Sequence, residues 1–202
     1  ASEYMQRIIT SSARMTRLIN DLLDFTRLSI NSAFELTDLN LVLEEVLSDL
    51  EVAIKEKEAC IEFAPLPQAE VIPGQIRQVL QNLISNALKF ARKGEQPIVR
   101  ITAERVAQLA TGAAPDPGGN YLRLCVTDNG IGFDNQYAEK IFTIFQRLHS
   151  REKYEGTGIG LAITKKIIER HNGVIAADSK EGQGTSFIMV LPLKQQPAEP
   201  AK

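Results

Sequence analysis

The stretch QVLQNLISNALKF (residues 78–90) decides the expected fold of this chain. Its apolar residues recur at helical spacing and would anchor a core helix, which Pro73 opens because proline is tolerated in a first helical turn. Asn82, Asn86 and Lys89 are four and three residues apart and therefore share one face. Burying such polar groups is costly unless they are paired, and a hydrated Mg²⁺ ion with a polyphosphate would pair with them. The alternative is a polar helix edge exposed to solvent.

Strand and helix patterns alternate on both sides of this helix. The expected elements are a strand in 34–40, a helix near 39–56, strands at 60–64, 70–72, 97–104 and 121–127, a helix ending near 170, and strands at 173–179 and 185–193. This order predicts an α+β fold, a two-layer α/β sandwich whose mixed sheet is covered on one face by helices. We expect this domain to span residues 36–193 and to be followed by a disordered tail over residues 194–202.

Residues 1–30 form a separate helical pattern. An apolar seam with alternating steps of three and four residues runs through Met5, Ile8, Ser12, Met15, Ile19, Leu22 and Thr26. We predict an N-terminal bundle helix whose partner is a missing segment or a second subunit; packing on its own globular domain is the alternative. The chain begins at Ala1 inside this pattern, so we expect it to be a fragment.

Three glycine-rich segments carry further candidate chemistry. The segment DNGIGF (128–133) follows a strand, and a carboxylate at a strand end can accept a hydrogen bond from an amine such as that of adenine; an ordinary Asn-Gly turn is the alternative. The segment EGTGIGL (155–161) precedes a helix and would favour phosphate, although it is neither a P-loop nor a Rossmann fingerprint. The segment GQGTSF (182–187) opens the last strand, where a simple hairpin turn is the alternative.

The composition excludes several functions. A net charge of −2 over 202 residues gives no basic field for nucleic acid, so we expect no nucleic-acid partner. No apolar run approaches the roughly 20 residues of a membrane span. Cys60 and Cys125 are predicted to be buried thiols of a reducing compartment, which favours a cytoplasmic location. The parent protein can still be membrane-bound.

Together the segments resemble the N, G1, F, G2 and G3 boxes of the histidine kinase ATP-binding domain. This domain belongs to the GHKL superfamily, with gyrase, Hsp90 and MutL, and has the Bergerat fold. The boxes are QNLISNALKF, DNGIGF, Phe142–Arg147, GTGIGLAI and GQGTSF. The helix ending in MTRLINDLLDFTRLS looks like the second helix of the dimerisation and histidine-phosphotransfer domain, and FQRLHSREKYEGTGIGLAI is similar to phytochrome-like and PAS-linked sensor kinases.

For the phosphate side, the resemblance implies ATP and Mg²⁺ as cofactors. Asn86 would be the Mg²⁺ ligand, and Asn82 would support the metal and the phosphates. Lys89 would contact phosphate oxygens, and Arg147 would steady the charge of the γ-phosphate. Asn86, Lys89 and Arg147 are therefore the expected catalytic residues.

For the adenine side and the lid, the resemblance assigns a second group of residues. Asp128 would bind the adenine amine, Gly130 and Gly132 would let the purine lie close, Phe90 would line the pocket, and Thr185 would approach the adenine through a water molecule. A mobile ATP lid would use as its hinge and phosphate cradle Gly156, Gly158 and Gly160, with Leu161 beside them.

The resemblance also favours a kinase over an ATPase. Hydrolysing relatives have a glutamate where this chain has Asn82, and a carboxamide cannot act as a general base. His149 and His171 are expected to be surface histidines, with the acceptor histidine upstream of Ala1. The implied partners are this phosphoacceptor helix, a response regulator receiver domain and a second subunit of the parent protein.

Two alternatives remain open. One is a nucleotide-binding or dimerisation module without catalysis, and the other is a serine kinase of the anti-sigma type. One departure from the family is the entry to the helix, where Ile72 precedes Pro73 in place of a capping aspartate.

Overall fold

The computed structural model describes residues 33–108, 120–148 and 157–195, and outside these ranges only six separate positions near the N-terminus. The elements with their bounds are β1 Glu35–Asp38, α2 Leu39–Asp49, α3 Glu51–Glu56, β2 Cys60–Phe63, β3 Gln68–Val71, α4 Pro73–Lys89, β4 Ile98–Val106, β5 Tyr121–Asp128, 3₁₀ turns Asn135–Tyr137 and Lys140–Phe142, α5 Gly160–Arg170, β6 Val174–Lys180 and β7 Gly184–Pro192.

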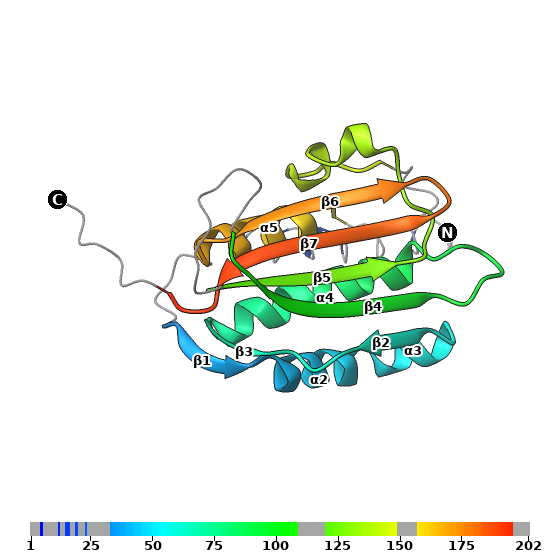
Figure 1. Ribbon diagram of the computed structural model, residues 1–202. Helices are drawn as coiled ribbons and strands as arrows, with labels where there is room; N and C mark the ends of the chain where they lie inside the picture. Colours follow the sequence, from blue (N-terminus) through cyan, green and yellow to red (C-terminus); the bar gives the residue numbers. More distant parts are fainter. Residues whose placement is uncertain are drawn as a thin grey trace.

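Five of these strands form one mixed sheet in the order β2-β4-β5-β7-β6. The pair β2 and β4 is parallel, and the other pairs are antiparallel. In Figure 1, α4 and α5 lie behind the strands of this sheet. The predicted α+β sandwich, with a mixed sheet covered by helices on one face, is confirmed. A small antiparallel sheet of β1 and β3, whose pairing we did not predict, lies beside α2.

The core lies between the large sheet and the helices. The apolar residues that recur at helical spacing on α4 are fully or nearly fully buried: Ile76, Val79, Leu80, Leu83, Ile84 and Leu88. Strands β4 and β5 contribute alternate residues such as Val99, Ile101, Leu124 and Val126. This packing fixes the rotation of α4, so its other face must point away from the core.

The two cysteines are free, but they are half-buried, so the prediction of buried thiols is wrong. Cys125 lies between the buried residues Leu124 and Val126, and alternation therefore places its side chain on the face of the sheet that carries no helix. Burial raises the pKa of the Cys125 thiol.

The predicted helix near 39–56 is interrupted at Leu50, where φ is −94° and ψ is 3°. The physical reason is that α2 buries an apolar face on α4, whereas α3 buries no side chain completely. The N–H of Ile54 still donates to the carbonyl oxygen of Leu50 at 2.9 Å, so the interruption is a local change of backbone angles at this residue.

The disordered tail was predicted to begin at residue 194, but Gln195 is still anchored to the domain. Gln195 accepts a hydrogen bond from Asn172, donates one to the carbonyl oxygen of His171, and donates its N–H to Glu70. The chain is thus fastened through Gln195, and residues 196–202 lie outside the described part.

The N-terminal helix is described at Met5, Ser12, Met15, Thr16, Ile19 and Leu23, which are all helical and exposed. Four of these belong to the predicted seam, and the remainder of residues 1–30 lies outside the described part. Among the described residues, no helix combines the length and apolar character needed to cross a membrane.

Candidate functional site

A cavity of about 280 Å³ lies along the polar face of α4. Asn82, Asn86 and Lys89 line it together, which confirms the predicted shared face. Gln78 also lines the cavity and was missed. Its position four residues before Asn82 was the available signal, since residues four apart lie on one helical face. α4 thus directs three carboxamides and one ammonium group toward the same space.

The two cations of the described cavity wall are Lys89 and Arg147. The ammonium group of Lys89 lies 4.2 Å from the ring centroid of Phe90, which also lines the cavity. Burial, and then the charge of Arg147, lower the pKa of Lys89. A bound anion between these two side chains would relieve this repulsion, because opposite charge favours the charged form.

Asp128 ends β5 and is the one carboxylate among the described residues that line the cavity. Burial raises its pKa to about 6, although hydrogen bonds from the backbone N–H groups of Gly130 and Thr185 oppose this shift. The Gly130 bond is 2.8 Å long. A hydrogen-bond donor bound in the cavity would pair with this carboxyl group, which burial has partly removed from water.

The turn after Asp128 has no space for side chains. A Cβ on Gly132, whose φ is +59°, would lie 2.1 Å from the carbonyl oxygen of Lys180. A Cβ on Gly130 would lie 2.6 Å from the carbonyl oxygen of Phe90. Both glycines therefore allow the turn to pack against the end of α4 and the β6–β7 turn. Gly132 lines the cavity, whereas Gly130 does not.

A buried pair of hydroxyl groups supports this end of the cavity. Thr185 lines the cavity, and its hydroxyl lies 2.9 Å from that of Ser179. Ser179 donates to the carbonyl oxygen of Gly184 at 2.9 Å and accepts from the N–H of Phe133. The hydrogen of the Thr185 hydroxyl is thus directed to Ser179, and Thr185 keeps acceptor capacity. Sequence reasoning found Thr185 but missed Ser179, which no motif distinguishes.

The start of α5 forms the opposite wall of the cavity. Gly158, Gly160 and Leu161 line it, whereas Gly156 lies outside the described residues. The carbonyl oxygen of Gly160 accepts hydrogen bonds from the Asn82 carboxamide at 3.2 Å and from Thr164 at 3.0 Å. The N-terminal end of a helix favours anions through its unpaired N–H groups and its dipole.

Phe142 and Phe145 anchor the segment that lies next to the start of α5. Phe142 is buried and packs edge-on against Phe187, with centroids 6.4 Å apart. Phe145 has a φ of +65° and donates its N–H to the carbonyl oxygen of Gly158 at 2.9 Å. This segment therefore lies directly beside Gly158.

His171 is buried, so its prediction as a surface histidine is wrong. Its Nε2 accepts a 3.0 Å hydrogen bond from the N–H of Ile72, and its Nδ1 lies 2.7 Å from the carbonyl oxygen of Ile167. The histidine thus satisfies the N–H at the start of α4, where Ile72 offers no side-chain cap. Phe34 packs edge-on against its ring. His149 lies outside the described residues.

The donor set of the cavity fits Mg²⁺ only together with a ligand that carries oxygen atoms. No group of three or more His, Cys, Asp or Glu residues that could hold a metal is found in the described part. The cavity offers instead the carboxamide oxygens of Gln78, Asn82 and Asn86. Mg²⁺ is commonly held by one or two protein oxygens plus water and phosphate, so these residues suit a metal that arrives with a polyphosphate.

Comparisons with known proteins agree with this arrangement. The family described as Histidine kinase-, DNA gyrase B-, and HSP90-like ATPase matches residues 72–195. The chain is 40% identical to Cyanobacterial phytochrome A of Nostoc sp., over 96% of this chain and 24% of that protein. It is 36% identical to Sensor protein kinase WalK of Staphylococcus epidermidis, over 95% of this chain and 30% of that protein. The chain therefore spans about a quarter to a third of the length of these relatives.

Solved structures show the same fold. Full-length ShkA in complex with AMPPNP has a TM-score of 0.73 and 28% identity, over 97% of this chain and 39% of that chain. The catalytic domain of histidine kinase ThkA, in a nucleotide-free form, has a TM-score of 0.64 and 28% identity, over 80% of this chain and 99% of that chain. ThkA in complex with response regulator protein TrrA, at 24% identity over 94% of this chain and 50% of that chain, shares the fold with a TM-score of 0.65. The chain thus belongs to the histidine kinase-, DNA gyrase B- and HSP90-like ATPase family and contains a catalytic domain of the sensor histidine kinase type.

Proposed function

We propose that this chain binds ATP with Mg²⁺ and transfers the γ-phosphoryl group to a histidine on a helix that is not among the 202 residues. One observation carries the proposal. The carboxamide and ammonium face of α4 lies across a single cavity from the N-terminal end of α5, with the raised-pKa carboxyl of Asp128 on the same wall. A nucleotide supplies the amine and the phosphates that these groups require.

The adenine end is supported by the groups around Asp128. The carboxylate would accept the hydrogen bond of the adenine amine, and Thr185 would accept a further one, directly or through water. Gly132 leaves the turn close enough for a flat base, and Phe90 provides an apolar wall. ShkA, which is 28% identical to this chain, was solved with AMPPNP, and this supports an adenine nucleotide as the ligand.

The phosphate end is supported by charge. Lys89 and Arg147 would bind phosphate oxygens, and the N–H groups at the start of α5 would add partial positive charge. Asn86 would hold Mg²⁺ through its carboxamide oxygen, and Asn82 would assist while its nitrogen stays bonded to Gly160. Bound with the nucleotide, Mg²⁺ would neutralise part of the phosphate charge.

The transfer step requires positioning more than proton removal. The lone pair of a neutral imidazole nitrogen attacks the γ-phosphorus, the bond from this phosphorus to the bridging oxygen of ADP breaks, and ADP keeps the electron pair. No general base is needed. Asn82 cannot accept a proton, and Asp128 is committed to the adenine end, which argues against activation of water for hydrolysis.

We propose that the acceptor histidine comes from elsewhere. His171 is buried, and both of its ring nitrogens already have backbone partners. The exposed seam residues Met5, Met15 and Ile19 support a bundle with a second copy, in which such a helix would stand. We propose a response regulator receiver domain as the next partner, as the complex of ThkA with TrrA suggests. The two free cysteines and the use of ATP support a cytoplasmic location.

A transfer assay tests this function. The chain is incubated with radiolabelled ATP, Mg²⁺ and a separately supplied bundle helix that carries a histidine followed by an acidic residue. We expect label on the helix that is lost in acid, and no label when the acceptor histidine is replaced by glutamine. Nucleotide binding without transfer would favour a regulatory module. An acid-stable product would favour the serine kinase.

A further inference from the structure

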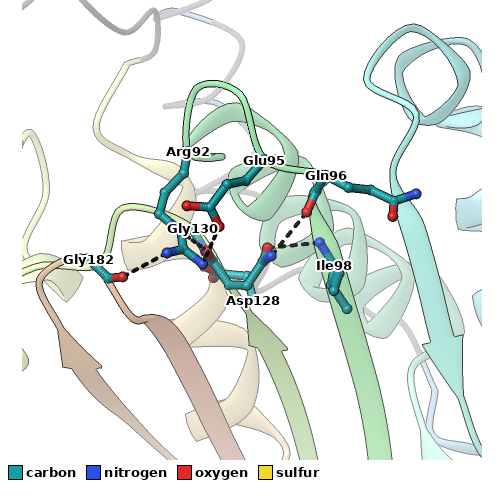
Figure 2. Close-up of polar contacts among 8 residues, drawn as sticks. Arg92, Glu95, Gln96, Ile98, Asp128, Gly130 and Gly182 are labelled. Atoms are coloured by element: carbon teal, nitrogen blue, oxygen red, sulfur yellow. Dashed lines mark hydrogen bonds and ion pairs between the residues drawn. The ribbon is translucent and has the colours of Figure 1, made fainter.

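Arg92 does not line the cavity, but it contacts the turn after Asp128, the β6–β7 turn and Glu95 of its own loop. Its Nε donates a 2.7 Å hydrogen bond to the carbonyl oxygen of Asn129, and one terminal nitrogen donates a 3.1 Å bond to the carbonyl oxygen of Gly182. The other terminal nitrogen forms an ion pair with Glu95 at 2.7 Å. Figure 2 shows the guanidinium group between Gly182 and the turn that follows Asp128.

Asn129 holds the same turn from the other side. Its carboxamide oxygen accepts from the N–H of Ile98 at 2.8 Å, and its nitrogen donates to the carbonyl oxygen of Gln96 at 3.0 Å. Its side chain thus fastens the turn to the start of β4. The backbone next to Asp128 is therefore fixed by Arg92 at the carbonyl group and by Ile98 and Gln96 at the side chain.

The contacts of Arg92 close a ring of hydrogen bonds. The N–H of Ile131 donates to the carbonyl oxygen of Phe90 at 2.9 Å, and the N–H of Gly182 donates to the carbonyl oxygen of Ile131 at 2.7 Å. Arg92 then joins Gly182 back to the segment after α4 that contains Phe90. This ring connects the end of α4, the turn after Asp128 and the turn that leads to Thr185.

We infer that Arg92 is a positioning residue that sets the turn of Asp128 against the turn of Thr185, and so sets the preference of the cavity for adenine. The inference rests on the proposed nucleotide function. Asp128 and Thr185 present hydrogen-bonding groups to the same end of the cavity, so their relative position decides which base edge fits. Arg92 bonds to both turns from outside the cavity wall, whereas Ser179 joins them through Phe133 and Gly184 from the inside.

Arginine suits this place for a geometric reason. The planar guanidinium group offers donors in fixed directions, so it can bond two carbonyl oxygens and a carboxylate at once. A lysine offers one nitrogen at the end of a flexible chain and cannot span the three acceptors in this way. Arg92→Lys therefore preserves the charge and removes the bridge.

Calorimetric binding of ADP and GDP, each with Mg²⁺, to the full chain tests this role. We expect Arg92→Lys to weaken ADP binding about threefold to tenfold, because about one hydrogen bond of positioning is lost, and to change GDP binding little. Glu95→Gln, which keeps both carbonyl bonds, should have a smaller effect. Arg123→Lys is the matched control, because Arg123 pairs with Glu104 on the open face of the sheet; it should bind like the wild type.

A double-mutant cycle separates positioning from a general loss of stability. In an Asp128→Ala chain, Arg92→Lys should not lower the ADP preference further, because Arg92 acts through Asp128. Unchanged ADP affinity and preference in Arg92→Lys would overturn the inference, as would an equal loss for ADP and GDP. If the wild type does not bind ADP in preference to GDP, the proposed function fails first, and this inference fails with it.

Discussion

The carboxamide nitrogen of Asn82 donates a 3.2 Å hydrogen bond to the carbonyl oxygen of Gly160. This bond joins the middle of α4 to the first residue of α5 across the wall of the cavity. The bond thus holds α4, which carries the carboxamides, at a fixed separation from the N-terminal end of α5. Nucleotide binding should depend on this bond.

Replacement of Asn82 tests the connection between these two helices. Asn82→Ala should weaken ATP binding about threefold to tenfold, since it removes one hydrogen bond and one oxygen from the phosphate side. Asn82→Asp should be worse, because its charge would repel the phosphates. Gln81→Ala, on the same helix but not on the described cavity wall, is the control and should bind normally. Equal affinities for all four chains would refute the role of Asn82.

The pH dependence of binding tests Asp128. Its pKa in the folded chain is raised to about 6 from 3.8, so the carboxyl is protonated below about pH 6. The adenine amine favours the ionised acceptor, and adenosine affinity should therefore fall as the pH drops through about 6. Adenosine avoids the titration of the phosphates. Asp128→Asn should remove this dependence; a wild-type affinity that stays flat from pH 7 to pH 5 would contradict the assignment.

The same carboxyl makes a prediction for stability. A raised folded pKa means that its stabilising contribution is full below pH 3.8 and is lost as the pH rises through about 6. Above pH 7, Asp128→Asn should therefore raise the free energy of unfolding, by about 1–2 kcal/mol after allowance for solvent at this partly exposed site. Denaturant unfolding at pH 8 measures this change, and a less stable variant would show that the burial of charge is not costly here.

His171 predicts an effect of the opposite sign. Burial, and to a smaller extent the charge of Arg170, lower its folded pKa below 6.5, although its bond to Ile167 opposes the shift. The unfolded chain therefore takes up a proton first as the pH falls below about 6.5, and the folded state loses stability. His171→Gln should cost about 2 kcal/mol at pH 8 and should flatten this loss between pH 7 and pH 5. A variant with the same pH slope as the wild type would exclude His171 as its source.

Two substitutions distinguish a glycine that is needed because a side chain would not fit from a glycine that is needed for hinge motion. Gly132→Ala should cost about 3 kcal/mol or more, because its Cβ would collide with the carbonyl oxygen of Lys180 at a φ of +59°. Gly160→Ala should fold normally, because its Cβ meets nothing closer than 3.6 Å. If Gly160 is a hinge of the lid, the second variant should still transfer phosphate more slowly. Thermal unfolding and the transfer assay report the two effects separately, and equal stability losses would contradict the packing argument.

Much of the fold and part of the site follow from local sequence patterns. The helical period that buries Val79, Leu83 and Leu88 also places Asn82 and Asn86 on the cavity side, so the core and the site are read from the same repeat. Asp128 is found because a strand with buried alternate residues ends directly before a glycine-rich turn.

The missed features depend on contacts distant in sequence. His171 bonds the N–H of Ile72, which lies 99 residues earlier, and no local pattern marks a histidine as a partner for a backbone group. Ser179 is paired with Thr185 across the β6–β7 turn, in a strand whose other residues are mostly exposed. The break at Leu50 lies between α2, which buries an apolar face, and α3, which buries no side chain completely, and helical spacing alone does not contain this difference.

The central claim is that Asn86 holds Mg²⁺ with the nucleotide, and Mg²⁺-dependent ATP binding tests it most directly. The dissociation constant is measured in Mg²⁺ and in EDTA for the wild type, for Asn86→Ala and for Gln81→Ala, a residue of α4 that does not line the cavity. We expect Mg²⁺ to tighten binding about tenfold or more in the wild type and in Gln81→Ala, and to have little effect in Asn86→Ala. If Asn86→Ala keeps the full Mg²⁺ effect, the account of this site is wrong.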